Sequence, residues 1–334
     1  MAKIVLGMGT SHGPMLVTPP ETWGARVPDD RLSKHHFEGR EWSFDELVDY
    51  RRAENLGKQT TLDVWKARHA QCLAAIEEMA RVLAEAKPDV VVIVGNDQME
   101  IFDTDCIPAL SVMCGPTIVN NMISHEKLQT MPPGVRHAMP GYMPDTASYS
   151  GVPELAKHII KTAMNDQFDV AALQRLSETE TPHAFGFVFR QLMKDQVIPT
   201  VPVLVNTFYP PNQPTVARCH AFGRSIGRAI QSWDTDARVA VIASGGLTHF
   251  VIDERVDQLV LSAMKNHDFS PVFELDEAIF QAGTSEIKNW IPVAGVMDEI
   301  GFDMTVVDYV PCYRSEAGTG NAMGFVYWKS PDQQ

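Results

Sequence analysis

The sequence predicts a single α/β domain, residues 1–334, built around a twisted mixed sheet that is flanked by helices. Short apolar runs rich in β-branched residues, at Ile4–Met8, Val90–Val94 and Val239–Ile242, are typical of buried strands. A long amphipathic pattern between the first two runs predicts a helix that connects them. We find no internal repeat, low-complexity tract or linker that would divide the chain.

The other elements are expected in alternation along the chain. Residues 15–58 lack a clear periodicity and predict a long functional loop or helical lid. The helix over Thr60–Ala86 is predicted by apolar residues that recur at spacings of three and four: Leu62, Trp65, His69, Cys72, Ile76, Met79 and Leu83. Residues 103–150, with several prolines and glycines, predict strand fragments in long loops. Further helices are expected at 153–164, at 216–232 and after a cap at Thr284 or Ser285, and further strands at 198–206, 304–309 and 322–328.

The composition excludes several classes of partner. The formal net charge of −14 argues against nucleic acid and acidic membranes, because phosphate binding needs clustered Lys and Arg. The five cysteines form no CxxC pair and are expected to be buried thiols in a reducing compartment. The sequence shows neither a signal-peptide pattern nor an apolar run of the roughly 18 residues that span a bilayer. We therefore expect a cytoplasmic protein without a membrane partner.

Polar residues follow three of the predicted strands. His12 follows the first, Gln98 follows the strand at 90–94, and His249 follows the strand at 239–242. Ligands in open α/β sheets bind at the carboxyl ends of the strands, so one site assembled from distant segments is expected. His12, His183 and His249 are the candidate functional histidines, since each flanks Gly, Pro or Ser at the end of an element. The sequence contains no HExxH, P-loop, GxSxG or GxGxxG motif.

Six motifs occur in an order that resembles the class III extradiol ring-cleavage dioxygenases, the family of the protocatechuate 4,5-dioxygenase beta subunit. They are Gly9-Thr-Ser-His12-Gly-Pro14, Val94-Gly-Asn-Asp-Gln98, Pro182-His183-Ala184, Asn206-Thr-Phe-Tyr-Pro-Pro211, Gly245-Gly-Leu-Thr-His249 and Ser285-Glu286-Ile-Lys-Asn-Trp290. The resemblance covers about residues 3–328, apart from the insertion at 15–58. It implies a non-haem Fe(II) held by two histidines and one carboxylate. Carried over motif by motif, His12 matches the first histidine ligand, Glu286 the carboxylate ligand, His249 the acid/base histidine and His183 a second pocket histidine.

One motif departs from the family. The family pattern ends Asn-Asp-His with the histidine on iron, whereas this chain has Asn96-Asp97-Gln98. Gln98 is neutral and a weaker ligand for Fe(II) than imidazole, which leaves three alternatives open. Gln98 ligates the metal through its oxygen, or His35 or His36 of the insertion supplies the missing nitrogen. In the third alternative the site holds no catalytic metal, and His12 and Glu286 are structural.

The expected function is cleavage of the aromatic ring of a substituted catechol-type substrate with O2, by an Fe(II)-dependent extradiol dioxygenase. Tyr209, Arg314 and Asn321 are candidate substrate contacts beside strand ends, with rigid loop packing as the alternative. An Arg would suit an aromatic carboxylate through bidentate pairing. Two other functions remain open: an iron-free subunit or interaction scaffold, and a metal-dependent hydrolase that uses Zn²⁺. A homodimer or a separate small helical subunit is a further possibility from the resemblance.

Overall fold

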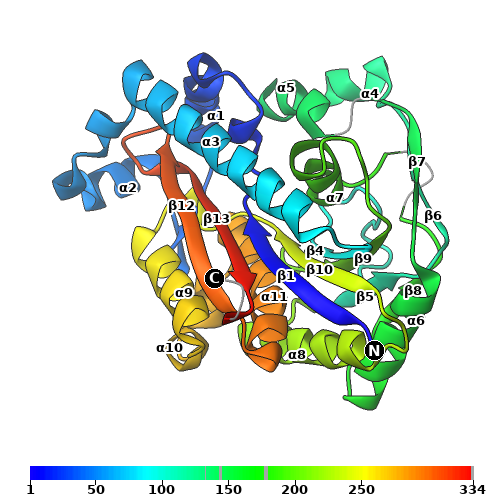
Figure 1. Ribbon diagram of the computed structural model, residues 1–334. Coiled ribbons are helices and arrows are strands. Elements are labelled where there is room, and N and C mark those ends of the chain that lie inside the picture. Colours follow the sequence, from blue (N-terminus) through cyan, green and yellow to red (C-terminus); the bar gives the residue numbers. More distant parts are fainter. Residues whose placement is uncertain (132, 143–144, 177–179, 332–334) are drawn as a thin grey trace.

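The computed structural model describes residues 1–131, 133–142, 145–176 and 180–331. In these residues nine strands form one mixed sheet in the order β11-β13-β1-β10-β4-β9-β5-β8, with β12 paired to the other edge of β13 (Figure 1). The strands are β1 Lys3–Thr10, β4 Val90–Gly95, β5 Leu110–Met113, β8 Ala171–Leu173, β9 Thr200–Val205, β10 Arg238–Ser244, β11 His249–Val251, β12 Asp303–Tyr313 and β13 Thr319–Lys329. The predicted fold class is confirmed.

The centre of the sheet is parallel. β1 pairs with β10, β10 with β4, and β4 with β9, all in parallel register. β4 and β9 are buried along their whole length, as expected for strands covered on both faces, and the side chains of β4 are all apolar. Antiparallel pairing begins at the borders, where β1 meets β13 and β9 meets β5. The three apolar runs that predict strands therefore lie side by side, with their carboxyl ends at one edge.

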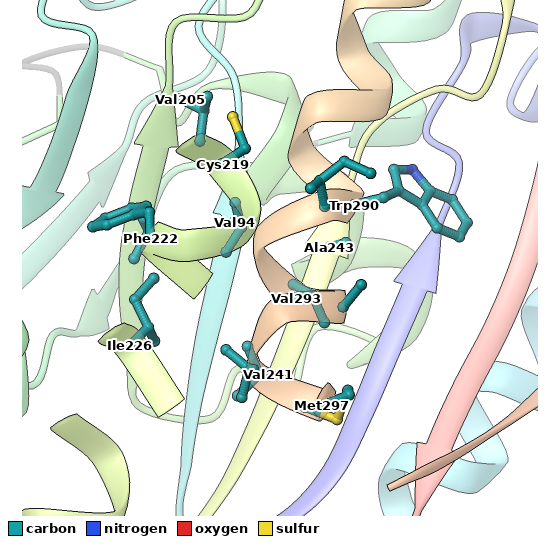
Figure 2. Packing of buried hydrophobic residues seen from close by; sticks show 14 of the residues in the cluster. Val94, Val205, Cys219, Phe222, Ile226, Val241, Ala243, Trp290, Val293 and Met297 are labelled. Atoms are coloured by element: carbon teal, nitrogen blue, oxygen red, sulfur yellow. The ribbon is translucent and has the colours of Figure 1, made fainter. Parts of the chain in front are cut away.

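Each face of the sheet has its own hydrophobic cluster because successive strand residues point to opposite faces. Val92 and Val94 of β4 belong to one cluster, and Val91 and Ile93 to the other. The first cluster contains α6 (Pro153–Asn165), α8 (Val216–Ser232) and α11 (Ile287–Ile300). Figure 2 shows Val94, Val241 and Ala243 of the sheet beside α8 and α11, whose side chains belong to the same cluster. The second cluster contains the predicted long helix, α3 (Leu62–Ala86), which crosses the opposite face (Figure 1).

The two helices α8 and α11 approach each other closely. A Cβ built on Gly223 of α8 would lie only 1.9 Å from the carbonyl oxygen of Pro292 in α11. A Cβ on Gly295 of α11 would lie 2.2 Å from the carbonyl oxygen of His220. Glycine is therefore needed at both positions to let the two backbones meet. This contact packs α8 against the middle of α11, the helix that directly follows Glu286.

The segment 15–58 is ordered and consists of short elements. They are η1 Pro14–Leu16, η2 Pro20–Arg26, α1 Val27–Leu32, β2 His35–Phe37, β3 Arg40–Trp42, α2 Phe44–Tyr50, η3 Arg52–Glu54 and η4 Leu56–Gln59. A capping box between Ser43 and Glu46 begins α2. Phe37, Trp42, Phe44 and Leu47 form a small cluster with Val251 and Ala317, which joins the segment to the β11–β13 edge of the sheet.

Residues 103–150 contain more helix than the expected strand fragments and loops. α4 (His125–Thr130) is capped by the Ser124 hydroxyl, and α5 (Pro133–Tyr142) follows it. The two helices lie in sequence between β6 (Thr117–Asn120) and β7 (Ala147–Ser150), which pair with each other in antiparallel register. The remaining elements are α7 His183–Phe187, η5 Val188–Leu192, α9 Glu254–Asn266, α10 Ser270–Phe273, η6 Glu277–Ile279 and η7 Ala282–Glu286. Across the described parts of the chain, no helix has both the length and the apolar character needed to cross a membrane.

Candidate metal centre and active site

The predicted site forms at the carboxyl edge of the parallel strands. β1, β10 and β4 are neighbours, so the residues that follow them meet although they are far apart in sequence. His12 follows β1, Ser244 ends β10, and Asn96 and Gln98 follow β4. Glu286 joins them from the end of η7, just before α11. The expectation that these segments assemble into one place is confirmed.

Glu286 is at the centre of the hydrogen-bond network. Its Oε2 lies 3.1 Å from Nε2 of His12 and accepts the backbone N–H of Gly246 at 2.9 Å. Its Oε1 accepts from Nδ2 of Asn96 and from Nε2 of Gln98, both at 3.3 Å. Burial raises the pKa of this carboxyl, but the charges of His249 and His12 outweigh burial and hold the pKa well below its ordinary value. Glu286 is therefore an anion at neutral pH.

His12 faces Glu286 in a way that calls for a cation between them. The Ser244 hydroxyl donates to the Ala184 carbonyl at 2.6 Å, so its oxygen accepts from Nδ1–H of His12 at 3.0 Å. Burial lowers the pKa of His12, against the opposing charge of Glu286, and so favours the neutral ring. Neutral His12 then points the lone pair of Nε2 at a carboxylate oxygen 3.1 Å away. Two facing acceptors repel each other unless a proton or a metal ion lies between them.

His183 is held by a carboxylate that the sequence analysis did not single out. Nδ1 of His183 lies 2.7 Å from Oε2 of Glu100, and its backbone N–H donates to Oε1 of the same residue at 2.8 Å. Burial lowers the pKa of His183, but Glu100 outweighs burial and raises it to about 9. The ring centroid of His183 lies 4.7 Å from that of His12 in an edge-to-face arrangement. A carboxylate on one ring nitrogen is typical of metal-binding histidines, because it leaves the other nitrogen free for the metal.

His249 is a further histidine close to the Glu286 carboxylate. Its Nδ1–H donates to the Leu247 carbonyl at 2.8 Å, which directs Nε2 toward Oε1 of Glu286, 3.6 Å away. Burial lowers the pKa of His249, but Glu286 and the Leu247 carbonyl outweigh it and raise the pKa above its ordinary value. His249 is thus suited to hold a proton near neutral pH.

His12, His183 and Glu286 form a group that fits a metal ion. One potential ligand atom from each lies within 4.8 Å of the others. Two imidazoles and one carboxylate are the donor set of the facial triad that binds non-haem Fe(II) and leaves positions open. The group therefore satisfies both the geometry and the chemistry of such a centre.

The metal-binding group opens into a cavity of about 420 Å³. This volume lies at the small end of the range of about 300–1,000 Å³ typical of small-molecule sites. Its apolar wall includes four methionines and three larger side chains: Met99, Met131, Met139, Met323, Ile123, Tyr142 and Phe250. Such a wall suits an aromatic ring and limits access of water.

Of the other predicted site residues, Asn321 and Gln98 line the cavity, whereas Tyr209 and Arg314 do not. Asn321 lines the cavity opposite His249 in the β11–β13 register. Gln98 lines it too, with its Oε1 3.4 Å from the Tyr209 hydroxyl, whereas Tyr209 itself stands behind Gln98 and does not reach the wall of the cavity. Arg314 differs from the expectation. Its Nε and one terminal nitrogen donate to Asp30 at 2.7 and 2.8 Å, so this buried guanidinium is engaged away from the cavity wall.

The alternative in which the insertion supplies a ligand is wrong. Nε2 of His35 lies 2.7 Å from the carbonyl oxygen of Asp30, and Nε2 of His36 lies 2.6 Å from that of Ala278. Neither residue lines the cavity. Both rings stabilise the inserted segment instead.

Four functional residues were missed by the sequence analysis. Ser244 orients His12, Glu100 holds His183, and the Tyr142 hydroxyl donates to the His12 carbonyl at 2.8 Å. Arg26, at the end of η2, lines the cavity. Ser244 ends β10 and Glu100 follows β4 by five residues. Their positions near the ends of predicted strands could therefore have indicated both residues. Tyr142 and Arg26 lie in segments without such a signal.

Comparison with known proteins identifies the family. Residues 58–319, more than half of the chain, match the family described as the catalytic LigB subunit of aromatic ring-opening dioxygenase. The chain belongs to this family. The match begins where the insertion ends.

Two curated relatives have names that describe their reactions. The chain is 32% identical over 114 residues to a gallate dioxygenase of Pseudomonas putida strain KT2440, which is 33% of this chain and 32% of the relative. It is 27% identical over 148 residues to a 2,3-dihydroxyphenylpropionate/2,3-dihydroxicinnamic acid 1,2-dioxygenase of Comamonas testosteroni, 42% of this chain and 43% of the relative. The matched segments thus cover less than half of either relative.

Proposed function

We propose that the protein is an Fe(II)-dependent extradiol dioxygenase that opens the ring of a catechol-type substrate with O2. The observation that carries the proposal is the His12, His183 and Glu286 group, buried at a mostly apolar cavity large enough for one aromatic ring. Family membership supports a ring-opening oxygenase, and the printed names of both relatives describe dioxygenases.

His183 is the proposed replacement for the histidine ligand that Gln98 lacks. Gln98 directs its Nε2 to Glu286, while its Oε1, the only atom that could bind a metal, is turned to the Tyr209 hydroxyl. His183 offers a ring nitrogen within reach of His12 and Glu286 and has the carboxylate support of Glu100. In this proposal Gln98 is a hydrogen-bond donor that orients Glu286.

Fe(II) in this group would lower the pKa of the catechol hydroxyls and let electrons pass from the substrate to O2. The residues of the chain transfer the protons, contact the substrate and exclude water. Nε2 of His249 accepts the second hydroxyl proton and returns it during ring opening, while the Leu247 carbonyl keeps Nδ1–H in place. Asn321 offers an amide to the substrate from the facing strand, and the apolar wall keeps water from the reacting ring. From the segment 15–58, the lid expected from the sequence, Arg26 lines the cavity.

The test is O2 consumption by protein reconstituted anaerobically with Fe(II), measured with a panel of catechols and with the absorbance of the ring-opened product. We expect coupled O2 uptake and product formation, lost in Glu286→Gln, which keeps the shape of the side chain but not its charge. A reconstituted protein that binds iron but consumes no O2 with any catechol would refute the proposal. Hydrolysis of an aryl ester by the Zn²⁺-loaded protein, without O2 uptake, would support the hydrolase alternative instead.

A further inference from the structure

The cavity wall includes one arginine, Arg26, that forms no ion pair within the described part of the chain. Among the described residues, three carboxylates line it, and each faces a basic partner that also lines it. Glu286 faces His12 at 3.1 Å, Glu100 faces His183 at 2.7 Å, and Glu180 pairs with Lys127 at 2.7 Å. One further cation, Arg26, also lines the wall.

The Arg26 guanidinium donates no hydrogen bond to any residue in the described part of the chain. The buried carboxylate of Asp30, which acts on the charge of Arg26, is already engaged by other residues. Its two oxygens accept from Arg314 at 2.7 and 2.8 Å, and Oδ2 also accepts from the Thr319 hydroxyl at 2.7 Å. Burial lowers the pKa of Arg26, and the positive charge of Arg314 lowers it further, against the weaker opposing charges of Asp30 and Asp29. Half-buried and unpaired, Arg26 has all its donors available to a ligand.

Arg26 also lies on the substrate side of the site. Asp30, its neighbour, bonds to Thr319, which precedes Asn321 by two residues on β13. Asn321 stands opposite His249 in register. Arg26, Asn321 and His249 line the same cavity, so one ligand can reach both the guanidinium and the metal-binding group.

We propose that Arg26 determines substrate specificity by binding the carboxylate of an aromatic acid whose diol faces His12, His183 and Glu286. The diol part of this ligand rests on the proposed ring cleavage. The guanidinium presents two parallel N–H donors that match a carboxylate, and the apolar wall between the two sites accommodates the ring. Arg26 lies in the segment 15–58, the insertion that the resemblance to the family does not cover.

Binding to metal-free protein tests the assignment without ring cleavage. Calorimetry would compare 4-hydroxybenzoate with 4-hydroxybenzamide, which has nearly the same shape but no charge. We expect the wild type to bind the benzoate about 10- to 100-fold more tightly, as for hydrogen bonds to a charged group. Arg26→Gln should lose this preference while its affinity for the amide stays the same. Arg26→Lys should retain only part of it, because an ammonium cannot form the bidentate pair.

Arg31→Gln is the matched control. It removes the same charge from the same segment, but Arg31 is exposed and pairs with Glu316 away from the cavity. This variant should keep the full preference. No preference in the wild type, or an unchanged preference in both Arg26 variants, would overturn the assignment.

The assay needs neither metal nor O2, so it separates this inference from the proposed function. An Arg26-dependent preference in a protein that opens no ring would refute the ring cleavage alone. Ring cleavage that is equally fast with 4-methylcatechol and with 3,4-dihydroxybenzoate, and unaffected by Arg26→Gln, would overturn the role of Arg26 alone.

Discussion

The affinity of the site for Fe(II) should depend on pH in a way that identifies the third ligand. A histidine must be neutral to bind a metal, and Glu100 raises the pKa of His183 to about 9. At pH 7 only about one His183 ring in a hundred is then neutral. His12 has a lowered pKa and Glu286 a pKa well below its ordinary value, so neither adds a pH dependence above pH 7.

The expected result is a gain in affinity of nearly tenfold between pH 7 and pH 8 that levels off toward pH 9, about 50-fold in all, because about half of the His183 rings are neutral at pH 9. One proton should be released per iron bound at pH 7. Competition with a chelator of known pH dependence, under anaerobic conditions, measures the affinity. Calorimetry in buffers of different ionisation enthalpy measures the proton release.

Glu100→Gln provides the internal control. Without the carboxylate, burial is the main influence on His183 and lowers its pKa, so the pH dependence above pH 7 should disappear. If Gln98 were the ligand, no proton would be released, because an amide does not titrate. A flat affinity profile in the wild type, or a slope that survives Glu100→Gln, would refute the assignment of His183.

Three further substitutions have expected outcomes. Gly223→Ala places a Cβ 1.9 Å from a backbone carbonyl oxygen of α11 and should lower the free energy of unfolding by about 1–3 kcal/mol in denaturant titrations. The control Gly227→Ala, whose Cβ would lie 3.3 Å from its nearest neighbour, should change that free energy by less than about 1 kcal/mol. Asp30→Ala leaves the buried guanidinium of Arg314 unpaired and should cost about 3–5 kcal/mol; an unchanged melting temperature would contradict this. His249→Gln should lower turnover about 10²- to 10⁴-fold with iron content unchanged, and parallel loss of both would contradict its role as acid/base.

Local patterns in the sequence were sufficient for the central part of the fold. The runs at 4–8, 90–94 and 239–242 are apolar on both faces, which is how central parallel strands differ from exposed ones. The polar residues after them could be assigned to one site because parallel strands end at the same edge. The helix predicted over residues 60–86 followed from its spacing, and in the structure it begins at Leu62, two residues after the predicted start.

Features that depend on contacts between distant residues could not be predicted in this way. Arg314 follows a strand end, as a substrate-binding residue often does, but its partner Asp30 lies 284 residues away in sequence. Arg26 precedes an insertion helix with no periodic pattern, so nothing in the sequence indicated that it faces the cavity. The helices α4 and α5 were missed because prolines and glycines in residues 103–150 favour loops locally.

The central claim is that His12, His183 and Glu286 hold the iron at which the catechol ring is opened. Anomalous diffraction at the iron absorption edge, from crystals of the protein loaded anaerobically with Fe(II), tests it most directly. We predict a single strong peak in the cavity, coordinated by Nε2 of His12, a ring nitrogen of His183 and a carboxylate oxygen of Glu286, with Gln98 outside the coordination sphere. A peak bound by Gln98 and not by His183 would contradict the ligand set. A loaded, O2-consuming protein with no iron in this cavity would contradict the whole account.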